Sequence, residues 1–251
     1  MYDRHAVLAP PWSGAAGVRV ASTTRLGGVS SPPWATLNLG SRTDDDPHAV
    51  AVNRDRLQAT LGLPAEPSWL RQVHGTAAVR AGHAGGHPEA DAAWTDERGV
   101  VCAVLTADCL PVVLADRSGG CAGVAHAGWR GLAAGVVEAT IAALPARPAD
   151  LRAWLGPAIG PRAFEVGDEV LEAFLESDPG AGAAFRRSIG GRWMANLYLL
   201  ARRRLCAHGV TAVDGGHWCT HGEPRRFFSH RRDGARTGRM ATLVWLEGSG
   251  R

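Results

Sequence analysis

The stretch TADCLPVVLADRSGGCAGVAHAGWRG, residues 106–131, contains two apolar runs that have the length of a buried β-strand. Cys109 stands directly before the first run, and His126 stands at the end of the second. After His126 the apolar residues change to helical spacing, so residues 120–144 predict a strand, a tight glycine turn and a helix. From the stretch alone, Cys109 and His126 are a nucleophile and its base, two ligands of one metal ion, or ordinary residues at strand ends.

Strands and helices are mixed along the rest of the chain without strict alternation. Strands are predicted within residues 18–34, 67–75, 99–106, 151–160 and 240–248, and the second of these ends at His74. Helices are predicted within residues 44–63, 167–177 and 192–209. This order predicts one α+β domain over residues 1–251, with mixed β-sheets flanked by helices.

The composition is that of a soluble globular protein and excludes several mechanisms. All 27 basic residues are arginines, so Schiff-base and P-loop chemistry that depends on lysine is excluded. The net charge of +3 is too small and too dispersed to indicate a nucleic-acid partner, and no window approaches the roughly 18 apolar residues of a membrane span. The five cysteines are widely spaced and the N-terminus lacks a signal peptide, so we expect reduced thiols in the cytoplasm.

Three residues form the main candidate site, because His74, Cys109 and His126 all stand at predicted strand edges. Two imidazoles and a thiolate are a natural ligand set for zinc, and three protein ligands leave a fourth position for water or substrate. The intervals between the three residues match no compact zinc motif. On spacing alone, each residue is more often a buried thiol or a hydrogen-bonded histidine than a ligand.

Two further segments carry residues suited to anions or substrates. In HAGWRG, Gly128 and Gly131 let a ligand approach the backbone, the following helix offers free N–H groups, and Arg130 can form paired hydrogen bonds to phosphate. The loop 23–40 contains Arg25 and Asn38, and such loops often close over sites. The alternatives are a plain strand-to-helix turn and an ordinary surface loop.

A second cluster of metal-ligand residue types occurs near the C-terminus. His217, Cys219 and His221 would lie on one face if this stretch were an extended strand. Glycines and a proline flank it, however, which indicates a loop and a structural or incidental role. The basic segment 229–239 could bind a phosphate or nucleic acid, but the expectation favoured here is a solvated basic turn before an edge strand.

Eight blocks taken in order over nearly the whole chain resemble the YfiH-like family, which is also called the laccase-domain or polyphenol-oxidase-like family and includes bacterial peptidoglycan editing factors. Each block alone is weak, but the eight in order are highly specific. They are TTRLGGVS with LNLG, DDDP followed by NR, QVHG, DAAWT, TADCLPVVLAD, HAGWRG, GPAIGP followed by FEVG, and FFSHRRDGARTGR.

The resemblance implies a fold grouped with the cytotoxic-necrotising-factor-like cysteine hydrolases and a zinc site on His74, Cys109 and His126. It implies purine nucleoside phosphorolysis of adenosine, inosine and S-methyl-5′-thioadenosine, with adenosine deamination and a role in peptidoglycan editing. The corresponding hypothesis has zinc orienting substrate or water, and Arg130, the helix start and Arg25 holding phosphate. Asp108 or a zinc-bound water would then move the proton.

Three alternatives stay open. A thiol hydrolase or amidase acting on peptide or peptidoglycan substrates would use Cys109 as nucleophile with His126 or His74 as its base. A copper polyphenol oxidase is disfavoured, because the chain contains no His-x-His pair. A non-catalytic editing factor would need a closed structural zinc site with four protein ligands, and only three are evident. The partners expected are a purine nucleoside and phosphate, and the chain is expected to be a monomer or a homodimer.

Overall fold

The computed structural model describes residues 7–82 and 86–248, and its first sheet is antiparallel throughout. The C-terminal strand β13 lies inside this sheet, paired with β2 on one side and β5 on the other. The strands predicted within residues 18–34, 99–106 and 240–248 are therefore confirmed, and the first of them ends at Thr23 before the predicted loop. In spatial order the strands are β1 (Val7–Leu8), β2 (Val18–Thr23), β13 (Met240–Leu246) and β5 (Val101–Thr106).

The second sheet has six strands and is mixed. Its two outer pairs, β12 with β8 and β3 with β4, are parallel, and the pairs between them are antiparallel. In spatial order they are β12 (Ala212–Gly215), β8 (Leu151–Leu155), β6 (Leu110–Asp116), β7 (Ala122–Ala127), β4 (Ala92–Thr95) and β3 (Ala78–Arg80).

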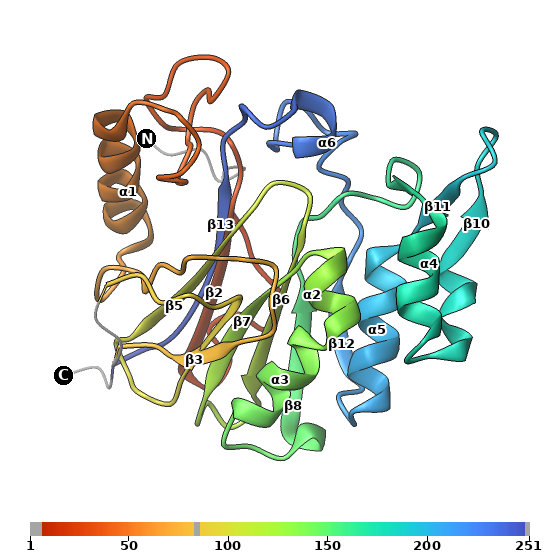
Figure 1. The fold of residues 1–251 in the computed structure, drawn as a ribbon. Coiled ribbons are helices and arrows are strands. Elements are labelled where there is room, and N and C mark those ends of the chain that lie inside the picture. Colours follow the sequence, from red (N-terminus) through yellow and green to blue (C-terminus); the bar gives the residue numbers. More distant parts are fainter. Residues whose placement is uncertain (1–6, 83–85, 249–251) are drawn as a thin grey trace.

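A small antiparallel sheet lies at the edge of the molecule beside α4 (Figure 1). Its strands are β10 (Phe185–Arg187), β11 (Trp193–Ala195) and β9 (Glu165–Val166). The helices are α1 (Pro47–Leu61), α2 (Trp129–Ala134), α3 (Val136–Ala143), α4 (Asp168–Leu175), α5 (Leu197–Ala207) and α6 (His230–Asp233), with 3-10 turns at Ala15–Gly17, Pro148–Asp150 and Pro179–Ala184.

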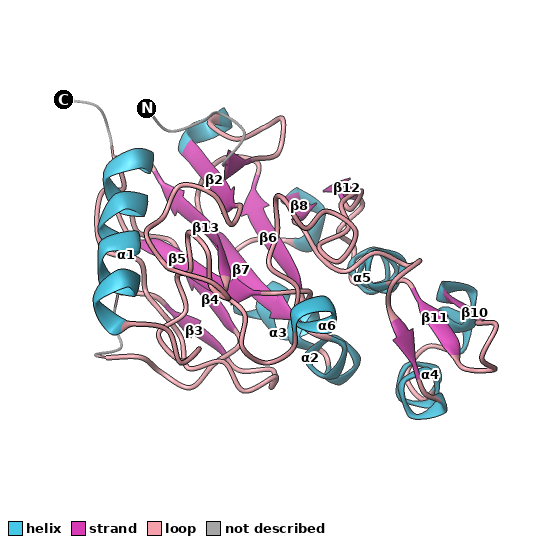
Figure 2. Ribbon diagram, turned by 90° about the horizontal axis from the view of Figure 1, so that it is seen from above, coloured by secondary structure: helices cyan, strands magenta, loops and turns pink. Residues whose placement is uncertain are grey.

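The two large sheets pack face to face between helices, which makes four layers (Figure 2). Val104 of β5 and Val124 of β7 belong to the apolar cluster between the sheets. On the outer face of the four-stranded sheet, Leu57 of α1 belongs to a second cluster. On the outer face of the six-stranded sheet, Leu114 of β6 packs in the cluster that contains Val137 of α3. The predicted α+β fold with mixed sheets flanked by helices is confirmed.

The helix α1 shows how local sequence sets these elements. The Asp46 side chain accepts a hydrogen bond from the backbone N–H of His48, and Pro47 occupies the first helical position, where its missing N–H costs nothing. Gly62 ends the helix with φ 58°, a left-handed conformation that favours glycine. The prediction of a helix within 44–63 is confirmed by this element.

Three sequence predictions are corrected by the structure. Residues 67–75 form only isolated bridges at Ser68 and Arg71 instead of a strand. The helix predicted after His126 is broken into α2 and α3 at Gly135, whose φ is 102°. The first residues of the predicted helix 192–209 form β11, because they pair with β10 and β9 before Asn196 caps α5.

No helix in the described part of the chain is long and apolar enough to cross a membrane.

Candidate functional site

The chain crosses from one sheet to the other at residues 107–109, and this crossing places Cys109. Thr106 ends β5 in the four-stranded sheet, and Leu110 begins β6 in the six-stranded sheet. The β6–β7 register sets Pro111 opposite His126, so that Cys109, two residues earlier, stands beside the end of β7. The two reactive side chains of the opening stretch therefore meet at one edge of the sheet.

His74 arrives on a separate turn. Its φ of 62° bends the backbone so that three consecutive N–H groups, those of Val73, His74 and Gly75, point to the same carboxylate. That carboxylate belongs to Asp91, and the three donor–acceptor distances are 3.1, 3.0 and 2.7 Å. Successive N–H groups in such a turn form a nest for an anion. The turn at His74 is therefore shaped by Asp91 and not by strand pairing.

The donor atoms of His74, Cys109 and His126 lie within 4.8 Å of one another, and in the described residues this is the one group of three that could hold a metal ion. The Sγ of Cys109 is 3.9 Å from Nε2 of His74. The two imidazole rings are 4.8 Å apart and inclined by 70°. Cys109 is half-buried, His126 is buried and His74 is exposed, so the group opens to solvent on the His74 side.

A glycine makes this grouping possible. A Cβ atom built on Gly128 would lie 2.8 Å from the Cys109 sulfur and 3.0 Å from Cδ2 of His74. The φ of Gly128 is −62°, which any residue can adopt, so the requirement is for space alone. Gly131 serves the same group indirectly, because its missing side chain lets α2 approach the carbonyl of Gly75.

Asp91 is a functional residue that the sequence reasoning missed. Its Oδ1 lies 2.8 Å from Nδ1 of His126, and the side chain is fully buried. The ring therefore donates from Nδ1 to Asp91 and presents Nε2 to the thiol and to any ion bound there. The sequence signal for this role is the aspartate at the start of the apolar strand DAAWT. A carboxylate buried there needs a hydrogen-bonding or charged partner, which His126 provides.

The charges of the group stabilise each other. Burial would raise the pKa of Cys109, but the imidazoles of His126 and His74 lower it to about 6. Burial would lower the pKa of His126, whereas the neighbouring thiolate and Asp91 raise it to about 9. Burial also opposes ionisation of Asp91, but its hydrogen bonds from His126 and from the turn keep its pKa below the usual range. At neutral pH these shifts favour a thiolate on Cys109 and an imidazolium on His126 in the metal-free group.

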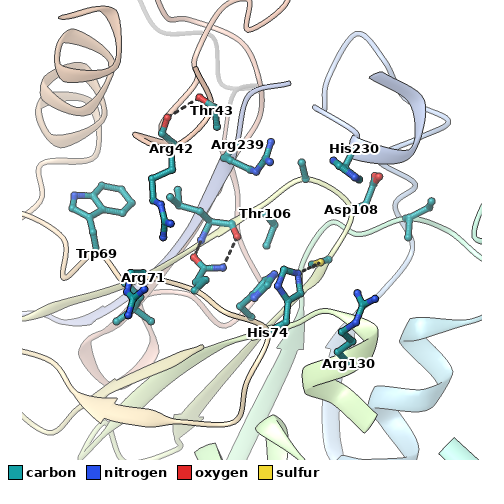
Figure 3. Close-up of a pocket in the computed structure, with 18 of the residues that line it drawn as sticks. Arg42, Thr43, Trp69, Arg71, His74, Thr106, Asp108, Arg130, His230 and Arg239 are labelled. Carbon is teal, nitrogen blue, oxygen red and sulfur yellow. Dashed lines mark hydrogen bonds between the residues drawn. The ribbon is translucent and has the colours of Figure 1, made fainter. Parts of the chain in front are cut away.

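These three residues lie in a cavity of about 700 Å³. In Figure 3, Arg130 lies on one side of His74, and Trp69, Arg42 and Arg71 lie on the other. The cavity falls in the size range of small-molecule sites. The predicted residue Arg130 faces it, with its guanidinium 4.5 Å from the centroid of the Trp129 ring. The helix behind Arg130, α2, has only six residues, which weakens the predicted contribution of a helix dipole.

Arg25 and Asn38 are not among the described residues that line the cavity. The Arg25 guanidinium donates to the carbonyls of Ala35 and Pro224, 2.9 and 3.0 Å away. Asn38 is fully buried, and its side chain joins the carbonyl of Gly40 to the backbone N–H of Arg239. Both residues hold the loops that frame the cavity.

Asp108 lines the cavity, but its carboxylate is occupied. It accepts hydrogen bonds from the hydroxyls of Thr220 and Ser229, at 2.5 and 2.9 Å, and from the backbone N–H of Arg231 at 2.7 Å. Its own φ is 89°, an unusual value for a residue other than glycine. This geometry favours a role in joining the C-terminal loops to the crossing at Cys109.

The stretch HWCTH forms a loop, as its flanking residues indicated. The sulfur of Cys219 accepts hydrogen bonds from the N–H groups of Gly160 and Gly222, each 3.3 Å away. His217 stacks against Trp218 instead of approaching the sulfur as a ligand. Together with His221, these residues form no group that could bind a metal among the residues described.

Comparison with known proteins gives matches over nearly the whole chain. A family model described as multi-copper polyphenol oxidoreductase laccase matches residues 19–247. The purine nucleoside phosphorylase PA4543 of Pseudomonas aeruginosa is 54% identical over 248 residues, which cover 97% of this chain and 99% of that protein. The purine nucleoside phosphorylase YfiH of Escherichia coli is 49% identical over 241 residues, which cover 96% and 98% of the two chains.

The fold comparison agrees. The crystal structure of protein NMB0706 from Neisseria meningitidis superposes with a TM-score of 0.92 at 49% sequence identity. The alignment covers 97% of this chain and all of that one.

Proposed function

This chain belongs to the YfiH-like, laccase-domain family, and from that membership we propose that it is a purine nucleoside phosphorylase. The observation that carries the proposal is the 54% identity, over almost the full length of both chains, to a protein that bears this name. The open cavity around His74, Cys109 and His126 supports it, because its size suits a nucleoside with phosphate beside it. The substrates proposed are inosine, adenosine and S-methyl-5′-thioadenosine.

We propose zinc as the metal of this site. Two imidazole nitrogens and one thiolate match the ligand set of catalytic zinc, and the hydrogen bond from His126 to Asp91 is the kind of outer contact that orients such a ligand. Bound zinc would act as a Lewis acid on an oxygen of the substrate. A copper oxidase would need more ligands than this one group provides in the residues described.

The chain's own residues divide the work of phosphorolysis. A phosphate oxygen must form a bond to C1′ while the bond from C1′ to the purine nitrogen breaks, and the leaving base must take up a proton. Arg130 is assigned to the phosphate, because its guanidinium faces the cavity and bonds to no acceptor in the part of the chain described. Asp108 and Asp91 hold the surrounding backbone through their hydrogen bonds, so the proton that the base takes up is assigned to a water in the cavity.

Phosphate-dependent release of hypoxanthine from inosine tests the proposal. The purified protein should contain one zinc per chain, release hypoxanthine only with phosphate, and lose this activity in Cys109→Ala. Cys206→Ala is the matched control, because Cys206 is an exposed cysteine on α5, outside the cavity. Activity that survives Cys109→Ala, or release that does not depend on phosphate, contradicts the proposal. Deamination of adenosine, seen as released ammonia, is expected as a lesser activity of the same site.

A thiol hydrolase is the second candidate, and one observation favours it. Asp91, His126 and Cys109 stand in the order of a carboxylate–imidazole–thiol triad, with the pKa of the thiol lowered to about 6. Such a site would act on peptide or peptidoglycan precursors in the cytoplasm. Purified protein that is free of zinc and is rapidly alkylated at Cys109 would support the hydrolase, whereas stoichiometric zinc bound by this thiolate supports the phosphorylase.

A further inference from the structure

The cavity wall is cationic well beyond what one phosphate ion requires. Among the described residues that line it, Asp108 supplies the one carboxylate, and this group is already occupied by Thr220, Ser229 and Arg231. Guanidinium groups of one sign around a concave site attract anions and raise their local concentration. The arginines that line the cavity are Arg42, Arg54, Arg71, Arg130, Arg231 and Arg239.

These arginines are not equally free. Arg54 donates to the carbonyl of Leu39, Arg231 to that of Glu165, and Arg239 to those of Thr237 and Gly238, so all three are partly used by the fold. Arg71 pairs with Glu89 at the surface. Arg42 and Arg130 have no hydrogen-bonding or ionic partner within residues 7–82 and 86–248, which leaves both guanidinium groups available to a ligand.

The two available guanidinium groups lie on opposite sides of the reactive trio. Arg130 is at one side of His74 and Arg42 is at the other (Figure 3), and both line the cavity. The phosphate ion that attacks the sugar is assigned to Arg130, on one side of the trio. The guanidinium of Arg42, on the other side, then has no anion to bind.

The loop that carries Arg42 is held firmly by buried groups. Asn38 donates from Nδ2 to the Thr43 hydroxyl at 2.8 Å and accepts at Oδ1 from the N–H of Gly40 at 3.0 Å. The same Oδ1 accepts from the N–H of Arg239 at 2.9 Å, which ties the loop to the start of β13. The backbone on both sides of Arg42 is thus fixed, and only its long side chain is free to adjust to a ligand.

We propose that Arg42 forms a second anion subsite that takes a phosphate ester on the nucleoside, so that the cavity binds purine nucleotides more tightly than nucleosides. The proposal rests on the phosphorylase function for its chemistry. The bond to the base at C1′ breaks and the bond to the attacking phosphate forms as before, and the ester group stays on the sugar unchanged. The expected product is a ribose that carries phosphate at both the 1 and the 5 positions.

Binding without turnover tests this assignment. Inosine and inosine 5′-monophosphate are titrated separately into the purified protein by calorimetry with no inorganic phosphate present, so that phosphorolysis does not occur. We expect inosine 5′-monophosphate to bind roughly tenfold or more tightly than inosine, and Arg42→Gln to remove this preference. Arg56→Gln is the matched control, because Arg56 is an exposed arginine of α1 outside the cavity.

The possible results bear separately on the subsite, on the ester as its ligand and on the phosphorylase function. Equal binding of the two ligands, or a preference that survives Arg42→Gln, overturns the subsite. Inorganic phosphate could bind alone at two sites per chain, with one of them lost in Arg42→Gln. That result would assign the Arg42 position to free phosphate and contradict its assignment to a phosphate ester. The protein could prefer the nucleotide, lose this preference in Arg42→Gln, and yet cleave neither ligand when phosphate is added. That result would support the subsite and contradict the phosphorylase function.

Discussion

Asp91 joins two of the three residues of the reactive trio, because its carboxylate accepts a hydrogen bond from His126 and also holds the turn that carries His74. These two histidines come from segments 52 residues apart (126 − 74). A single buried charge thereby sets the tautomer of one ligand and the position of another.

Replacement of Asp91 by asparagine should separate positioning from catalysis. The asparagine amide carries no charge, and its NH2 group cannot accept the hydrogen bonds that the carboxylate oxygens accept. We therefore expect the affinity for zinc to fall about 10- to 100-fold. The free energy of unfolding should fall by about 1–3 kcal/mol, because a buried charged acceptor of four hydrogen bonds is lost. Competition with a coloured chelator measures the first, and urea denaturation the second. Asp96→Asn, at a surface pair with Arg80, should change neither, and unaltered zinc affinity in Asp91→Asn would refute the positioning role.

The reactivity of Cys109 should depend on pH with a low midpoint in the metal-free protein. Since the pKa of Cys109 is lowered to about 6, the thiolate persists at neutral pH and is lost only as the pH falls below about 6. Alkylation by iodoacetamide after removal of metal should therefore reach half its plateau rate near pH 6. In His126→Ala the main partner is missing, and the midpoint should move upward. A midpoint near 8.5 in the unmodified chain would contradict the ion pair.

Gly128→Ala should damage the site while the fold stays intact. The added Cβ would sit 2.8 Å from the Cys109 sulfur, so the thiol or the histidine turn must shift. We expect zinc content and activity to drop by at least tenfold, because misplacement of a ligand by a fraction of an ångström is costly. Gly182→Ala, whose Cβ meets Leu175 at an ordinary 3.8 Å, is the control. Full zinc occupancy and activity in Gly128→Ala would show that the close approach is unimportant.

Asp108→Asn tests whether that residue moves a proton or holds loops. If it holds the loops around Thr220 and Ser229, the melting temperature should fall while the pH profile of kcat/KM keeps its shape. A proton-transfer role predicts the opposite, namely the disappearance of one limb of the profile at little cost in stability. The two readouts together decide between the roles.

Arg130→Gln should act on phosphate alone. Because the guanidinium has no acceptor in the described chain, its loss removes a charge-assisted contact to the ion and should raise the KM for phosphate about tenfold or more. The KM for inosine should change little. Arg117→Gln, an exposed arginine beyond the end of β6 and outside the cavity, is the control. An unchanged KM for phosphate would place the ion elsewhere.

Most elements were predictable because their signals are local, whereas the grouping of His74 with Cys109 and His126 rested mainly on the family resemblance. Apolar runs of strand length marked β5, β6 and β7, and Cys109 and His126 stand beside β6 and in β7. His74 was placed by the family resemblance, because the strand predicted to end at it does not form. Glycine is unfavourable inside a helix, so Gly135 was a sequence signal for a break in the predicted helix. The helical spacing of apolar residues continues across Gly135, which is why one helix was predicted instead of two.

The rest of the site depends on contacts between distant segments. Asp91 acts only because β4 lies beside β7, and the turn at His74 exists only because Asp91 is there. Arg42 lines the cavity because Asn38 ties its loop to Arg239, a contact between residues 201 positions apart. Periodicity carries no information about such pairings, so these residues could not be assigned from sequence alone.

The position of β13 has a consequence for how the protein is made. This strand is the last along the sequence described, yet it lies between β2 and β5, which pair with it and not with each other. Until β13 has been synthesised, β2 and β5 therefore lack the strand that pairs with these edges in the fold, and unpaired edges favour aggregation. Arg239, which directly precedes β13, lines the cavity. The cavity wall is therefore complete only after residues 240–246 have left the ribosome and paired.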